Sequence, residues 1–181
     1  GFSIGGSCAI KYAENSDIKP AAVFAIDPPL DFERFYNAAK RDVRLSKENQ
    51  ANQENVYMIE RLEKETGGNP TTHRTEYYAI SPYSFSDTTQ SAIKKLTGMP
   101  IRIYTEPDIN WWLQERNLDC MSMNAIEASA MINELQRLGN QKAELLLTQN
   151  KGYRKPDNVR HPHSWSIVDN DDLIKWLLKQ R

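Results

Sequence analysis

The chain begins with GFSIGG (residues 1–6), and an apolar segment suited to a short helix, Cys8–Ala13, comes next. Gly1, Ser3 and Gly5 form the pattern Gly-x-Ser-x-Gly. A nucleophilic serine in this pattern lies on a tight turn between a strand and a helix, and the glycines allow the helix to approach the strand closely. The stretch therefore predicts a turn at Ser3 that leads into a helix. Alone it is a weak signal, because glycine and serine are common residues.

Three short segments further along are candidate strands, and the first is a continuous apolar run typical of a buried parallel strand. They are Ala21–Asp27, which ends at two prolines, then Pro100–Glu106 and Lys142–Gln149. Helical patterns alternate with these segments: one apolar face runs from Ala128 to Leu138, and a last helix begins near Asp169. Alternation of this kind implies a parallel sheet with right-handed crossovers. The predicted fold class is α/β, with a parallel sheet flanked by helices.

The segment 31–75 interrupts this alternation. Its pattern is helical and strongly charged up to Thr66, with a thin apolar stripe of Val56, Ile59 and Leu62. The polar run GGNPTTHRT, residues 67–75, then breaks the helix. We expect a single domain over residues 1–181 that carries a helical cap or insert at 31–75, packed by one narrow face.

Composition excludes several classes of function. The 181 residues are 39% hydrophobic and 26% charged with a net charge of −1, so nothing favours nucleic acid or an anionic membrane surface as partner. No apolar run approaches the ~20 residues of a membrane span. Cys8 and Cys120 match no zinc spacing, and the acidic run at 169–172 suits a helix N-terminus, not a calcium loop. We expect no metal and no organic cofactor, and the sequence leaves the cellular compartment open.

A catalytic site needs more than a serine. The hydroxyl becomes a good nucleophile when a base accepts its proton and a third group orients that base. Asp108 comes just after the second predicted strand, and His163 lies between the third strand and the last helix. In open α/β sheets, reactive groups gather beyond the carboxyl ends of the strands. Ser3, Asp108 and His163 are thus candidates for nucleophile, orienting acid and base.

Two of these assignments have alternatives within the chain. Asp27 ends the first predicted strand and competes with Asp108 for the role of the acid; we favour Asp108. His161 competes with His163, because Pro162 between them leaves only one imidazole facing the serine; we favour His163.

The order serine, acid, histidine resembles that of the α/β-hydrolases of the serine esterase, lipase and peptidase type. The resemblance runs through GFSIGG, AAVFAIDPPLD, ISPYSFS, MPIRIYTEPD and HPHSWSIVDNDDLIKWL, and the insert at 31–75 stands where that family carries a variable cap. It implies an acyl-enzyme mechanism on a small ester or amide, with the backbone N–H of Ile4 as one oxyanion donor. Trp111 and Trp112 then either line a substrate pocket or serve packing.

The resemblance also implies that the chain corresponds to the C-terminal portion of such a fold, starting at the serine turn. The strands that precede this turn in the family, and the loop with the second oxyanion donor, have no counterpart here. We therefore expect Ala21–Asp27 to be an open edge strand through which the chain dimerises or aggregates. We also expect low activity, since nothing upstream holds the turn at Ser3. A non-catalytic binding or dimerisation module of the same fold is the alternative.

Overall fold

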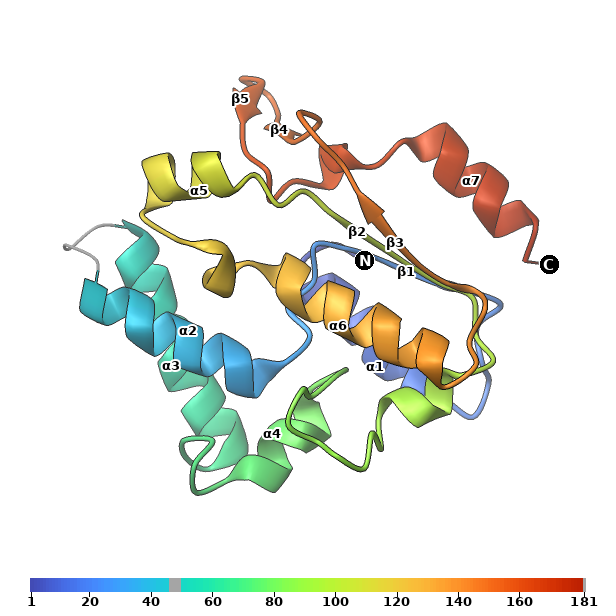
Figure 1. Ribbon diagram of the computed structural model, residues 1–181. Coiled ribbons are helices and arrows are strands. Elements are labelled where there is room, and N and C mark those ends of the chain that lie inside the picture. The colour runs from blue at the N-terminus through green and yellow to red at the C-terminus, as the bar shows by residue number, and fades with distance from the viewer. Residues whose placement is uncertain (46–49, 181) are drawn as a thin grey trace.

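The computed structural model describes residues 1–45 and 50–180, and Figure 1 shows its arrangement. The helices are α1 (Ile4–Asn15), α2 (Phe32–Leu45), α3 (Gln50–Thr66), α4 (Arg74–Ile80), α5 (Ile109–Arg116), α6 (Asn124–Arg137) and α7 (Asn170–Leu178). The strands are β1 (Val23–Ile26), β2 (Ile101–Thr105), β3 (Ala143–Leu147), β4 (Tyr153–Arg154) and β5 (Val159–Arg160). Short 3₁₀ turns lie at Ile93–Leu96, Cys120–Ser122 and Trp165–Ile167.

The centre of the molecule is a parallel sheet with the strand order β1-β2-β3. Val23 pairs with Ile101, and Ile101 pairs with Ala143 on its other side, so the strands begin at the same level. Each of the three strands falls within a segment that the sequence predicted. The predicted α/β class, a parallel sheet flanked by helices, is confirmed.

Alternate residues of the strands pack against opposite helical layers, as the two-residue period of a strand requires. Ala25 and Ile103 belong to a cluster with the apolar faces of α1 and α6, which lie together on one face of the sheet (Figure 1). Ile26 and Tyr104 belong to another cluster with Leu173 and its neighbours on α7, which covers the opposite face. The sheet is therefore the middle of three layers.

The first residues of the chain lie along the outer edge of β1. The Ile26 N–H donates to the Gly1 carbonyl at 2.8 Å, and the Ser3 N–H donates to the Ile26 carbonyl at 2.8 Å. The Gly1 amino group donates to the Phe24 carbonyl at 2.9 Å. The expectation of an open edge was wrong, because the edge of β1 is paired from Phe24 to Ile26. These bonds also hold the turn at Ser3, which removes the reason given for low activity, and the low activity itself stays a prediction. Dimerisation through the rest of that edge stays a prediction.

Helices α2, α3 and α4 form a separate group with its own apolar cluster (Figure 1). Ile59 and Leu62 of α3, from the predicted stripe, pack there against Tyr36 of α2 and Tyr77 of α4. The buried carboxylate of Glu127 on α6 joins this group to the sheet layers. It accepts hydrogen bonds from the N–H groups that lead into α2 and forms an ion pair with Arg34 at 2.5 Å.

One segment has more structure than its sequence suggests. In the polar stretch that follows β3, β4 and β5 form a short antiparallel hairpin. Two strands of two residues give too brief an alternation to stand out as a pattern. In residues 1–45 and 50–180, no helix is long and apolar enough to cross a membrane.

Candidate active site

Ser3 occupies the turn that its sequence pattern predicts. Its φ of 52° and ψ of −131° are unfavourable for a residue with a side chain, and such strain is typical of functional turns. Glycine neighbours make the turn possible. A Cβ on Gly1 would lie 2.1 Å from the Gly5 carbonyl oxygen, and a Cβ on Gly6 would lie 3.0 Å from the Cβ atoms of Ala25 and Pro28. Helix α1 thus begins directly against the end of β1.

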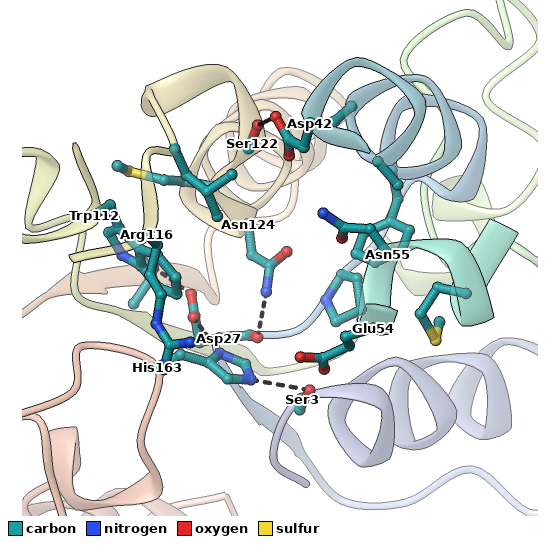
Figure 2. Close-up of a pocket in the computed structure, with 18 of the residues that line it drawn as sticks. Ser3, Asp27, Asp42, Glu54, Asn55, Trp112, Arg116, Ser122, Asn124 and His163 are labelled. Atoms are coloured by element: carbon teal, nitrogen blue, oxygen red, sulfur yellow. Dashed lines mark hydrogen bonds and ion pairs between the residues drawn. The ribbon is translucent and has the colours of Figure 1, made fainter. Parts of the chain in front are cut away.

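His163 lies between Ser3 and an acidic side chain (Figure 2). Its Nε2 is 3.1 Å from Ser3 Oγ, and its Nδ1 is 2.6 Å from Asp27 Oδ2. The ring of Phe2 packs against the imidazole with a centroid distance of 4.7 Å. Of the two candidate histidines, His163 is therefore the one that faces Ser3.

The acid beside His163 is Asp27, not Asp108. Asp27 directly follows β1, and its φ of 44° is in the left-handed region. Thr105 Oγ1 donates to Asp27 Oδ1 at 2.7 Å, which leaves Oδ2 for the imidazole. The backbone is fixed as well, because Asn124 donates to the Asp27 carbonyl at 2.8 Å. The side chains of His163, Thr105 and Asn124 thus all bind this one buried aspartate.

Asp108 has a different role, so the prediction that it orients His163 was wrong. It is the N-cap of α5, where Oδ1 accepts the Trp111 N–H at 3.1 Å. Its other oxygen accepts from Arg160 Nη2 at 2.7 Å. The carboxylate is therefore engaged on both oxygens by groups other than the histidine.

Glu106, which the chain places two residues before Asp108, anchors the segment that carries His163. Its buried carboxylate accepts from Thr148 Oγ1 and from the Lys151 N–H, both at 2.9 Å. It also pairs with Arg160 Nη1 at 2.6 Å. Arg160 therefore bridges Glu106 and Asp108, and ties the hairpin that precedes His163 to the end of β2.

His161 is a buried partner of aromatic rings. Its ring lies 4.7 Å from that of Trp111 and 5.6 Å from that of Trp112. Burial, then the charges of Arg154 and Arg116, lower its pKa to about 3, so the ring is neutral near pH 7. Its Nε2 lies 3.5 Å from Arg116 Nη2, and because arginine only donates, Nε2 must be the acceptor.

The site opens into a cavity of about 370 Å³, within the range of about 300–1,000 Å³ usual for small-molecule sites. Ser3, His163 and Trp112 line it, and so does Ile4, the residue whose N–H was expected to serve the oxyanion. Ile4 is the first residue of α1, where backbone N–H groups have no acceptor within the helix. Trp111 is not among the lining residues and supports His161 instead.

Helices α2 and α3 supply the wall opposite Trp112. Figure 2 shows Glu54 and Asn55 of α3 on that side, and Asp42 of α2, whose Oδ1 accepts from Ser122 at 3.0 Å, at its far end. In the described part of the chain, no group of three or more His, Cys, Asp or Glu side chains could hold a metal ion. The nucleophilic and ionisable side chains that line the cavity are serines, histidines, carboxylates and arginines.

Several functional candidates escaped the sequence analysis. Phe2 and Thr105 hold the histidine and the aspartate, but a phenylalanine in a Gly-x-Ser-x-Gly turn or a threonine at a strand end is unremarkable in sequence. Arg116 and Arg154 reach the cavity from a helix end and from the hairpin. The sequence holds one signal that could have identified Arg116: it is four residues after Trp112, a spacing that puts both side chains on the same face of a helix.

Comparison of the chain with protein-family models, with curated proteins and with solved structures gave no match.

Proposed function

We propose that the chain is a serine hydrolase of the α/β-hydrolase type, which cleaves carboxylic esters or amides through an acyl-enzyme. One observation carries the proposal: the continuous contact from Ser3 Oγ to His163 Nε2, and from His163 Nδ1 to Asp27 Oδ2, at 3.1 and 2.6 Å. A nucleophile that contacts a base, and a base that contacts an orienting acid, are the groups that acyl transfer requires.

Each residue then has a defined task. His163 takes the proton from Ser3 Oγ as that oxygen attacks the carbonyl carbon, and returns it to the leaving alcohol or amine. The carboxylate of Asp27 accepts the Nδ1–H, holds the correct tautomer and stabilises the imidazolium that forms. Water then attacks the acyl-enzyme in the same way, with His163 again as base.

The oxyanion of the tetrahedral intermediate needs donors beside Ser3. The N–H of Ile4 is at the positive end of the α1 dipole, where negative charge is stabilised. The acid follows β1, not β2 as expected for Asp108. It still lies where reactive groups gather in a parallel sheet, because Ser3, Asp27 and Thr105 are all at the carboxyl ends of neighbouring strands.

The test is labelling with a fluorophosphonate probe, read by intact mass, on the natural chain, Ser3→Ala and Ser122→Ala. Ser122 is the matched control, because it lines the same cavity but donates to Asp42 and has no histidine partner. We expect one adduct on the natural chain and on Ser122→Ala, and none on Ser3→Ala. An adduct that persists in Ser3→Ala, or a natural chain that takes no label, contradicts the proposal.

A further inference from the structure

Two arginines lie at the same end of the cavity as the histidines. Arg116 is the last residue of α5 and Arg154 belongs to β4, and both line the cavity that holds Ser3. Within residues 1–45 and 50–180, neither has a carboxylate oxygen within 4 Å. The other cation near the site, Arg160, is neutralised by Glu106 and Asp108. Among the described residues, both guanidinium groups at this end of the cavity are therefore without a close ion-pair partner.

Arg116 is held in place by neutral groups. Its Nη2 lies 3.5 Å from the Nε2 of His161, and its guanidinium lies 5.9 Å from the centre of the Trp111 ring. His161 is only 7% exposed and is fixed between the two tryptophan rings. These contacts orient the guanidinium without compensating its charge. Figure 2 shows Arg116 beside Trp112 and close to the Asp27 and His163 pair.

Arg154 is held directly against the catalytic histidine's backbone. Its Nη2 donates to the His163 carbonyl at 3.2 Å. Partial burial and then the charge of Arg116 lower the pKa of Arg154. The two cations thus repel each other next to the base of the triad, and an anion bound between them would relieve that repulsion.

The remaining charges of the cavity limit the anion to a single negative charge. Asp27 is engaged by His163 and Thr105, and Asp42 by Ser122. Glu54, on the opposite wall, already attracts Arg154. A doubly charged ligand group such as a phosphate would be repelled by the Glu54 carboxylate. A singly charged carboxylate on the ligand would pair with the two guanidinium groups and be repelled less.

We propose that the preferred substrates are esters or amides that carry one carboxylate near the bond to be cleaved, and that Arg116 and Arg154 bind this carboxylate. The inference rests on the proposed function, since it names the substrate class of the same site. A guanidinium suits this task because its paired N–H groups match the two oxygens of a carboxylate.

The experiment compares esters that differ in one charge. The mono-4-nitrophenyl ester of glutaric acid is paired with 4-nitrophenyl pentanoate for a charge on the acyl side. For a charge on the leaving group, 4-acetoxybenzoate is paired with its methyl ester. The kcat/KM values are measured on the natural chain, Arg116→Gln, Arg116→Lys, Arg154→Gln and Arg137→Gln. Arg137 is the control, because it is an exposed residue of α6 outside the cavity and its substitution changes the net charge equally.

In at least one pair, we expect the natural chain to prefer the charged ester by about tenfold or more, the range of a hydrogen bond to a charged group. Arg116→Gln should remove most of that preference, chiefly through KM, because the contact exists before and during the reaction. Arg116→Lys should keep part of it, and Arg154→Gln should reduce it as well. Each variant is judged by the ratio of kcat/KM between the charged and the neutral ester of a pair, because a loss common to both esters cancels in that ratio. Arg137→Gln should leave every ratio unchanged.

Two other outcomes have distinct meanings. Hydrolysis of all four esters with no preference for charge, or a preference that survives Arg116→Gln and Arg154→Gln, overturns the inference and leaves the proposed function intact. If none of the four esters is hydrolysed and the serine takes no fluorophosphonate label, the proposed function fails, and the inference fails with it.

Discussion

Asp27 Oδ2 lies 2.6 Å from the Nδ1 of His163, although 136 residues separate them in the chain. The contact exists because β1 and the segment after β3 both deliver their next residues to the same edge of the sheet. The two aspartates therefore have different partners: Asp27 binds His163, whereas Asp108 binds Trp111 and Arg160. The two acids can therefore be separated by experiment.

Asp27→Asn should lower kcat by roughly 10⁴, the effect of removing this charge from a serine triad. The amide keeps the size of the side chain but offers its NH₂ or a neutral oxygen to Nδ1, so the tautomer and the imidazolium both lose support. Steady-state hydrolysis of 4-nitrophenyl pentanoate, or of whichever ester the chain turns over best, provides the measurement.

Asp108→Asn is the matched control for that prediction. It removes one partner of Arg160 and keeps an N-cap side chain, so kcat should fall by less than about tenfold while the folded protein becomes slightly less stable. Equal losses in both variants would contradict the assignment of Asp27 as the acid of the triad.

The two glycines after Ser3 should respond in opposite directions to alanine. A Cβ on Gly6 would lie 3.0 Å from Ala25 Cβ and 3.2 Å from the Gly1 carbonyl oxygen, whereas a Cβ on Gly5 has no neighbour within 4 Å. Gly6→Ala should therefore lower the free energy of unfolding by about 1–3 kcal/mol, the usual cost of overpacking. Gly5→Ala should raise it by up to about 1 kcal/mol, because alanine favours helix.

Urea unfolding followed by circular dichroism at 222 nm measures both changes. A Gly6→Ala chain as stable as Gly5→Ala would show that α1 can move away from β1, which the bonded turn at Ser3 does not allow in this arrangement.

Arg160→Met should be strongly destabilising, by about 3–5 kcal/mol, because it leaves the buried carboxylate of Glu106 without its cation. The double variant Glu106→Gln with Arg160→Met should recover part of this loss, since the uncompensated charge is then gone. Thermal unfolding of the two variants and the natural chain checks the prediction. A double variant that is less stable than Arg160→Met would mean that Glu106 acts mainly through Thr148 and Lys151.

His161 gives the stability a dependence on pH. Its pKa in the fold, about 3, is below the ordinary value of 6.5. The neutral ring therefore contributes its full stabilisation above pH 6.5, and that contribution is lost as the pH falls from 6.5 toward 3. His161→Phe cannot take up the proton, so the natural chain should lose stability relative to it by up to about 1.4 kcal/mol per pH unit in this window.

Unfolding free energies of the natural chain and His161→Phe, compared at pH 7.5, 6 and 5, test this slope. A constant offset between the two chains reflects packing against Trp111 and Trp112 and does not matter. A difference that stays the same at all three pH values would show that His161 is solvated enough to be protonated in the fold.

The sheet was predictable because each strand carries its own signal. Val23–Ile26 lies in a continuous apolar run that ends at two prolines, and Ile101–Thr105 is rich in β-branched and aromatic residues and follows Gly98 and Pro100, so no tertiary contact is needed to recognise them. Ser3 followed from its Gly-x-Ser-x-Gly pattern, and His163 from its position between the third predicted strand and the last helix. Position along a strand is a one-dimensional property that sequence records well.

The choice between Asp27 and Asp108 was not predictable in this way. Both follow a strand, and what separates them is a left-handed φ at Asp27 and an arginine, Arg160, that comes to Asp108 from a hairpin whose four strand residues form no visible pattern. The cavity arginines were missed for the same reason. The role of each of these residues depends on where a later segment of the chain packs, and the local sequence does not predict that packing.

The apolar cluster of α2, α3 and α4 has a consequence for how such a protein can change over evolutionary time. That cluster shares no buried residue with the two clusters around the sheet, yet Phe35, Asp42 and Met58 from its helices line the cavity. Substitutions on these helices can therefore alter which molecules enter without loosening the layer that aligns Ser3, Asp27 and His163. In the hydrolase that we propose, selection can therefore act on substrate choice and on catalytic geometry as two nearly independent traits.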